Sequence, residues 1–142
     1  AGQPLLGICV GLQALVDHSQ ENDGVECLGI LPGRVRHFGS EMQDHKGHRL
    51  KVPHMGWNQV CLAPHPMWQD IPQDSRFYFV HSYYVEADDP MLVAASCSYG
   101  VEFTAAVQRN NVFAVQFHPE KSSEMGLRML ANFGRVVREQ TS

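Results

Sequence analysis

The stretch Gly7-Ile8-Cys9-Val10-Gly11-Leu12-Gln13 decides how this chain begins its fold. The residues before Cys9 belong to a short apolar run that is typical of a buried strand, whereas those after it begin a helical spacing. The chain is therefore predicted to turn from strand to helix at the cysteine. Glycines two positions before and after it complete the pattern Gly-x-Cys-x-Gly, in which a strained turn lifts a nucleophilic side chain out of a sheet. We expect bulky side chains at either glycine to collide there.

A helix that begins at Val10 would aim its unpaired N–H groups and the positive end of its dipole at the sulfur of Cys9. Such surroundings stabilise a thiolate over a thiol. The sequence thus predicts that Cys9 is an activated nucleophile. The alternative interpretation is a small buried cysteine between two packing glycines.

A second motif, His118-Pro119-Glu120, follows the strand-like run at 112–117. The proline ends the strand, and a carboxylate two residues from a histidine can fix the tautomer of the imidazole and stabilise its cation. Taken alone, the motif could equally be a surface histidine and a first-turn helix acid. Together with Cys9 it predicts a Cys-His-Glu triad, with the sulfur within hydrogen-bonding reach of the imidazole.

These two motifs, GICVGLQ at 7–13 and VQFHPEKSS at 115–123, resemble those of the triad (class I) glutamine amidotransferases. Two stretches between them, KVPHMGWN at 51–58 and YFVHSYY at 78–84, narrow the resemblance to the glutaminase subunits of imidazole glycerol phosphate synthase. In those enzymes a glutaminase feeds ammonia to a (β/α)8-barrel cyclase of histidine biosynthesis. The resemblance covers essentially the whole chain, and it implies an α/β fold with a flavodoxin-like sheet and antiparallel additions.

The resemblance implies hydrolysis of glutamine through a glutamyl thioester. Cys9 would attack the side-chain carboxamide, and His118, held by Glu120, would protonate the departing ammonia and then activate water. The N–H of Val10 would donate a hydrogen bond to the oxyanion of the tetrahedral intermediate. No metal or organic cofactor is expected.

The same resemblance implies contacts to the substrate and to a cyclase subunit. The residues expected to hold glutamine are Gln13, Glu21 and the backbone at Ser82 and Tyr83. The residues expected on the docking face are His54, Met55, Trp57, Tyr78 and Lys121. Without the resemblance, these residues would be interpreted as solvent-facing positions or as strand and core packing.

The chain begins at Ala1, immediately before the predicted elbow strand, so the resemblance implies that the N-terminal third of the family's domain is missing. That third would include the N-terminal strands of the sheet and a loop that donates a second oxyanion N–H. We therefore expect weakened or absent turnover and self-association of the truncated chain through its exposed sheet edge. Two alternatives are a non-catalytic docking fragment of the same subunit and an amidotransferase of another pathway.

Length, composition and charge limit the number of domains, the classes of partner and the cellular location that we expect. A length of 142 residues with 44% hydrophobic content predicts one domain over 1–142, and a net charge of −4 gives no electrostatic reason to expect nucleic acid or an anionic membrane. The sequence shows neither an apolar run of the roughly 20 residues that a membrane span needs nor a secretion signal, so a cytoplasmic location is expected. The four cysteines lack a Cys-x-x-Cys pair and are interpreted as reduced thiols.

The pattern of apolar residues also predicts the order of elements. The elbow helix should end near 18–22, and a hairpin turn is expected at Asn110-Asn111. The closing helix should be capped by Ser122 or Ser123, and its apolar residues repeat at helical spacing from Leu127 to Val137. The predicted strands cover 25–31, 34–38, 60–62, 77–84, 92–95, 103–107 and 112–117.

Overall fold

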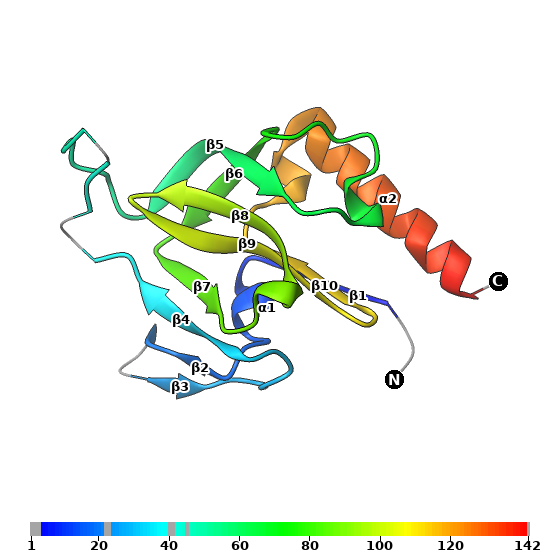
Figure 1. Cartoon of the computed structure of the whole chain (residues 1–142), viewed down its shortest axis with the longest axis horizontal. Helices are drawn as coiled ribbons and strands as arrows, with labels where there is room; N and C mark the ends of the chain where they lie inside the picture. The colour runs from blue at the N-terminus through cyan, green and yellow to red at the C-terminus, as the bar shows by residue number, and fades with distance from the viewer. Residues whose placement is uncertain (1–3, 22–23, 40–41, 45, 142) are drawn as a thin grey trace.

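A computed structural model describes residues 4–21, 24–39, 42–44 and 46–141 of the chain (Figure 1). Within these ranges, ten strands are hydrogen-bonded into one sheet. The strands are β1 (Leu5–Ile8), β2 (His18–Ser19), β3 (Val25–Glu26), β4 (Gly33–His37), β5 (His54–Leu62), β6 (Arg76–His81), β7 (Tyr83–Ala87), β8 (Val93–Tyr99), β9 (Val101–Arg109) and β10 (Val112–Val115). The helices are α1 (Val10–Gln13), α2 (Ser123–Thr141) and the 3-10 segments η2 (Pro66–Trp68), η3 (Pro90–Leu92) and η4 (Pro119–Lys121).

The strands run in the spatial order β3-β2-β4-β7-β9-β8-β5-β6, and β10 joins β9 to β1 beside this path. The pairs β1/β10 and β2/β4 are parallel, and the other pairs in the described ranges are antiparallel. The observed architecture is α/β, and its sheet contains both parallel and antiparallel pairs. This confirms the predicted fold class with its antiparallel additions.

The parallel pair β1/β10 positions the two sequence motifs. Ile8 lies opposite Val115, and the N–H of Cys9 continues the ladder with a 2.8 Å bond to the carbonyl of Val115. Because parallel strands end at the same edge of a sheet, the residues that follow both strands emerge together. Cys9 and the segment that leads to His118 therefore share one edge.

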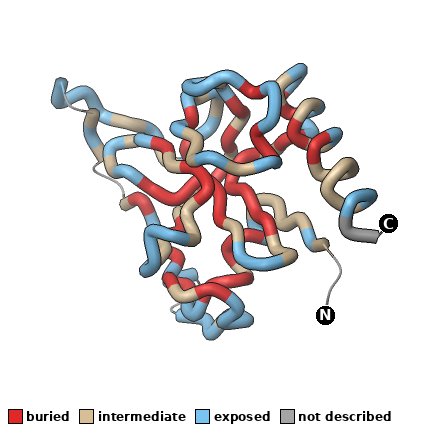
Figure 2. Tube along the Cα trace, turned by 45° about the vertical axis from the view of Figure 1, so that its right-hand side comes forward, coloured by how far each residue is buried: buried red, intermediate tan, exposed pale blue. Residues whose placement is uncertain are grey.

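The core lies on both sides of β10, whose successive side chains point to opposite faces. Phe113 and Val115 belong to a large aromatic cluster with Phe117, whereas Ala114 belongs to a smaller aliphatic cluster that includes Leu12 of α1. Figure 2 shows many of the buried residues near the middle of the molecule. The strand that leads to the histidine is thus packed from both faces.

Helix α2 covers the aromatic side through Met129, which is fully buried in the larger cluster. Its start at Ser123 confirms the predicted closing helix, although Leu127 is 64% exposed and does not pack as its spacing indicates. No helix in the described ranges is both long and apolar enough to cross a membrane.

The elbow helix is shorter than predicted, because it ends at Gln13 and not near 18–22. The carbonyls of Ala14, Leu15 and Val16 accept hydrogen bonds from backbone N–H groups in the segment 28–31. These tertiary bonds use the acceptors that a longer helix would need. They also hold 28–31 in an irregular path, so the predicted strand at 25–31 is a strand only over Val25–Glu26.

The predicted strand over 77–84 is in fact two strands separated by Ser82. β6 pairs with β5, whereas β7 pairs with β4 and β9, so the chain changes neighbours at this residue. The predicted hairpin between β9 and β10 is confirmed. Asn110 in its turn has φ 53°, the left-handed conformation that asparagine tolerates and that such tight turns require.

Candidate active site

Cys9 occupies the turn between β1 and α1 with a backbone φ of 55°. A positive φ is unfavourable for a residue with a Cβ and is typical of functional turns. A Cβ added at Gly7 would lie 3.1 Å from the Cβ of Ala114 and 3.3 Å from the carbonyl of Gly11, so the expected crowding at Gly7 is confirmed. Among the described residues, a Cβ added at Gly11 would meet nothing within 4 Å, so the crowding expected at Gly11 is not found for this atom.

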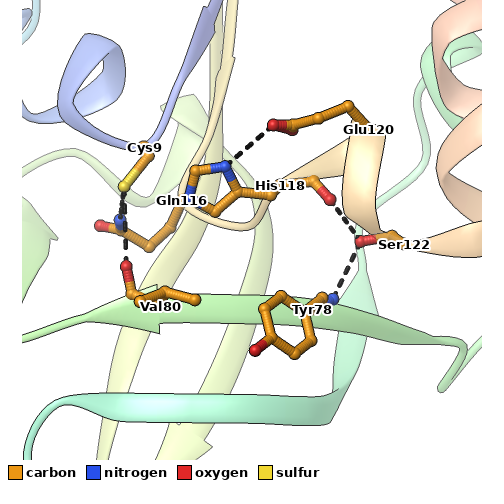
Figure 3. A network of polar contacts seen from close by, with 7 residues as sticks. All are labelled: Cys9, Tyr78, Val80, Gln116, His118, Glu120 and Ser122. Atoms are coloured by element: carbon orange, nitrogen blue, oxygen red, sulfur yellow. Dashed lines mark hydrogen bonds and ion pairs between the residues drawn. The ribbon is translucent and has the colours of Figure 1, made fainter.

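The sulfur of Cys9 lies between a carbonyl and an amide (Figure 3). Its S–H donates to the carbonyl of Val80 at 3.8 Å, and Nε2 of Gln116 donates to the sulfur at 3.6 Å. Burial raises the pKa of the Cys9 thiol, and this effect outweighs the N–H of Val10 and the amide of Gln116, which lower it. The predicted shift of the Cys9 pKa toward the thiolate is therefore wrong in direction.

His118 and Glu120 lie beside the cysteine, with the imidazole ring between Cys9 and Glu120 in Figure 3. Nδ1 of His118 is 3.1 Å from Oε2 of Glu120. A carboxylate at Nδ1 holds the proton there and leaves Nε2 with its lone pair. In the described part of the chain, no hydrogen bond joins the sulfur to the imidazole, so the direct contact that we expected is absent in this resting arrangement.

A closed set of hydrogen bonds holds the backbone of His118 against β6. The N–H of His118 donates to the carbonyl of Tyr78 at 2.9 Å, and the N–H of Tyr78 donates to Oγ of Ser122 at 2.9 Å. The hydroxyl of Ser122 then donates to the carbonyl of His118 at 2.6 Å. Ser122 directly precedes α2, and its carbonyl accepts from the N–H of Gly126, but both of these bonds of its hydroxyl lie outside that helix. Ser122 ties the histidine loop to the sheet, a role that its position in the sequence did not reveal.

Gln13 and Gln116 form a second link to the cysteine. Nε2 of Gln13 donates to Oε1 of Gln116 at 3.1 Å and to the carbonyl of Tyr83 at 3.2 Å. Both glutamine side chains are buried, and Gln116 is completely inaccessible to solvent. Sequence reasoning did not single out Gln116, because a buried glutamine after a strand has no pattern of its own.

The other residues expected to hold glutamine are Glu21, Ser82 and Tyr83, and their hydrogen bonds within the part of the chain that the structure describes are not to Cys9 or His118. The carbonyl of Ser82 accepts from the N–H of Phe38, and the carbonyl of Tyr83 is already used by Gln13. Glu21 is exposed, and its N–H donates to Oγ of Ser19. In the described ranges, no hydrogen bond or ion pair joins the Glu21 side chain to Cys9 or His118.

The residues expected on the docking face lie on β5, β6 and η4. Met55 is 62% exposed and Trp57 is 48% exposed, and the ring of Trp57 meets that of Tyr78 edge-on at 5.8 Å. Lys121 is also exposed. His54 does not belong to this face, because it is only 3% exposed: alternate residues of a strand point to opposite sides, and His54 points inward.

His54 instead forms a buried pair with His81. Nδ1 of His81 donates to the carbonyl of Tyr83 at 2.7 Å, and Nδ1 of His54 then donates to Nε2 of His81 at 3.0 Å. Burial lowers the pKa of His54 to about 3 and that of His81 to about 4. Both rings are therefore neutral at neutral pH. Among the described residues, no cluster of His, Cys, Asp and Glu is arranged to hold a metal ion.

Residues 1–137 match the family described as glutamine amidotransferase class-I, and the chain belongs to this family. Imidazole glycerol phosphate synthase subunit HisH 1 of Pseudomonas aeruginosa is 58% identical over 132 residues, which are 92% of this chain and 62% of that protein. The HisH subunit of Aromatoleum aromaticum is 60% identical over 135 residues, which are 94% and 63% of the two chains. The chain thus spans less than two thirds of the length of these curated relatives.

The fold is also similar to that of a solved structure of low sequence identity. The glutaminase domain of Trypanosoma brucei CTPS superimposes with a TM-score of 0.60 at 18% identity, covering 93% of this chain and 60% of that one. A likeness at this identity supports the fold alone.

Proposed function

We propose that this chain carries the glutaminase centre of an imidazole glycerol phosphate synthase, which hydrolyses glutamine and passes ammonia to a cyclase subunit. The observation that carries the proposal is the parallel pairing of β1 with β10. It brings Cys9 and the His118-Glu120 pair to one sheet edge from opposite ends of the chain. The names of the HisH relatives support the choice of pathway.

In the proposed reaction, the thiol proton of Cys9 passes to Nε2 of His118 as the sulfur attacks the carboxamide carbon of glutamine. The oxyanion that forms accepts a hydrogen bond from the N–H of Val10. His118 returns the proton to the departing ammonia, which leaves a glutamyl thioester. Water, activated by the same nitrogen, then releases glutamate, while Glu120 stabilises the imidazolium in both steps.

The resting contacts of Cys9 bear on the rate. The S–H of Cys9 faces the carbonyl of Val80, so the sulfur must turn toward the imidazole before it can react. We therefore expect low turnover in the isolated chain and faster turnover when a bound partner and substrate favour the reactive arrangement.

The proposed docking face consists of Met55, Trp57, Tyr78 and Lys121. Lys121 of this face belongs to η4, which also carries Glu120, so ammonia would be released close to the partner. Ammonia that escaped into water near neutral pH would mostly become ammonium, a poor nucleophile. Exposed aromatic and apolar side chains beside one lysine are suited to a water-excluding contact with a charged rim.

The test is a glutaminase assay of the 142-residue chain with and without the purified cyclase, together with a binding measurement. Cys9→Ala should abolish turnover and spare association, whereas Trp57→Ala should weaken association by about tenfold or more. Cys61→Ala, which removes an exposed thiol, is the matched control and should change neither quantity. Residual turnover in Cys9→Ala, or loss of its association, would contradict these roles.

A second candidate is a docking subunit without turnover. It is favoured by the absence, among the described residues, of a hydrogen bond between the sulfur of Cys9 and the imidazole of His118. Association with the cyclase but no glutamate release, under any partner or substrate concentration, would support this candidate.

A further inference from the structure

Gln116 is a fully buried polar side chain that lies against the proposed nucleophile. Its backbone N–H bonds to the carbonyl of Ala105 at 2.8 Å, which continues the β9/β10 ladder for one residue and fixes the direction of the side chain. Its amide then lies between Gln13 and Cys9, as Figure 3 shows on the cysteine side. A buried amide of this kind is stable only when its polar atoms are paired.

The orientation of this amide is determined by the carbonyl of Tyr83, which can only accept. The NH2 group of Gln13 must face that carbonyl, and the same NH2 group faces Gln116. Gln116 must therefore turn its oxygen toward Gln13 and its NH2 group toward the sulfur. The reverse orientation would bring an NH2 group against an NH2 group at one end and remove the donor from Cys9 at the other.

The two neighbours of the sulfur act differently on its two protonation states. The carbonyl of Val80 accepts a hydrogen bond from the thiol, but its partial negative charge repels a thiolate. The N–H of Gln116 donates weakly to a thiol and more strongly to a thiolate, since hydrogen bonds to an ionised acceptor are stronger. When the S–H bond breaks and the proton forms an N–H bond with His118, Gln116 therefore stabilises the charge left on the sulfur.

We propose that Gln116 is a positioning residue that holds the sulfur of Cys9 and stabilises its thiolate, and that Gln13 fixes the orientation of Gln116. The inference rests on the proposed function in one respect, namely that Cys9 is the nucleophile. It adds a second donor to the sulfur, from a side chain, beside the backbone N–H of Val10.

The experiment measures alkylation of Cys9 by iodoacetamide as a function of pH, with the Cys9 peptide quantified by mass spectrometry. Only the thiolate reacts, so the midpoint of this profile reports thiolate formation and needs no glutamine turnover. Gln116→Met removes the donor with little change of shape. It should raise the midpoint by about one pH unit, which corresponds to about tenfold slower alkylation near neutral pH.

Two further variants and two controls complete the design. Gln116→Glu keeps an acceptor for Gln13 but places a carboxylate at the sulfur, so it should raise the midpoint more than Gln116→Met. Gln13→Leu, which does not touch the sulfur, should raise it less. Gln108→Leu, a half-buried glutamine bonded to the carbonyl of Met91, is the matched control, and the exposed Cys61 in the same sample is the internal reference. The alkylation midpoint of Cys9 should not change in Gln108→Leu, and that of Cys61 should not change in any of the variants.

A Cys9 midpoint that stays unchanged in folded Gln116→Met, or in Gln116→Glu if the first variant does not fold, would overturn the inference. An equal rise at Cys61 would also overturn it, because the effect would then be global. Failure of the proposed function would look different: the unmodified chain would release no glutamate, while the shift in the alkylation profile would remain.

Discussion

The two glycines around Cys9 have the same place in the motif but different physical roles. At Gly7 the neighbours are the Cβ of the buried Ala114 and the backbone of Gly11, and neither can move without shifting the sheet or the turn. At Gly11 the added atom would enter open space. Packing therefore requires the first glycine and not the second.

This difference predicts opposite effects on stability. Gly7→Ala should lower the free energy of unfolding by about 1–3 kcal/mol, because it overpacks a rigid site. Gly11→Ala should leave it unchanged or raise it by up to about 1 kcal/mol, because alanine loses less backbone entropy in a helix. Urea unfolding followed by circular dichroism measures both. Equal destabilisation by the two changes would contradict the packing argument.

Ser122 offers a second test at single-residue scale. Ser122→Ala leaves the part-buried N–H of Tyr78 without its acceptor and removes the donor to the carbonyl of His118. We expect a loss of about 1–3 kcal/mol in stability and, if the proposed function holds, a lower kcat with little change in KM.

The matched control is Ser75→Ala, which removes a hydroxyl that donates to the carbonyl of Pro72 nearer the surface. It should cost about 1 kcal/mol or less and leave kcat unchanged. A kcat that falls equally in both variants would show that Ser122 does not act through His118.

At the scale of elements, the start of helix α2 is pressed against the η4 segment that carries Glu120. A Cβ added at Gly126 would overlap the carbonyl oxygen of Pro119, with a side-chain atom of Ser122 2.8 Å away. Further along the same helix, a Cβ at Gly134 would meet only the flexible end of Arg138 at 3.5 Å. The absence of a side chain at Gly126 therefore allows α2 to pack directly against the backbone of Pro119, the residue after His118.

The two glycines of α2 therefore form a matched pair of variants. Gly126→Ala should destabilise the chain by about 3 kcal/mol or more, because backbone must move to admit the methyl group. Gly134→Ala should stabilise it by about 0.5–1 kcal/mol through helix propensity. Thermal unfolding distinguishes them. A Gly126→Ala variant as stable as the unmodified chain would mean that α2 is not held at this distance from η4.

At the scale of the whole molecule, the buried pair His54 and His81 makes stability depend on pH. Their pKa values of about 3 and about 4 in the folded chain lie below the ordinary value of 6.5, so the unfolded chain binds more protons below pH 6.5. The contribution of the pair is fully present above that pH and is lost as the pH falls toward 4 and then 3. By pH 5 the loss should be on the order of 2–4 kcal/mol for the pair.

Urea midpoints between pH 8 and pH 4 measure this loss. His54→Phe should reduce the pH dependence, because one titrating ring is removed while an aromatic ring still stacks between Phe79 and Tyr99. An unchanged slope in His54→Phe would show that the acid sensitivity arises elsewhere.

The sequence by itself determined the features that depend on neighbouring residues. The turn at Cys9, the hairpin at Asn110, the closing helix and the adjacency of His118 to Glu120 follow from local sterics, turn preferences and a spacing of two residues. The motifs also sufficed to indicate the family, since their residues are contiguous. In each case, the interactions that decide the structure lie within a few positions of one another.

Tertiary structure alone decided the features in which distant segments compete for the same groups. The elbow helix stops at Gln13 because the segment 28–31 takes the carbonyls that would continue it, and His54 points inward because the face of β5 that it occupies packs on the aromatic cluster. Burial raises the pKa of the Cys9 thiol, and the amide of Gln116, more than a hundred positions away, lowers it. Burial and long-range hydrogen bonds depend on how the strands assemble, and no local pattern encodes them.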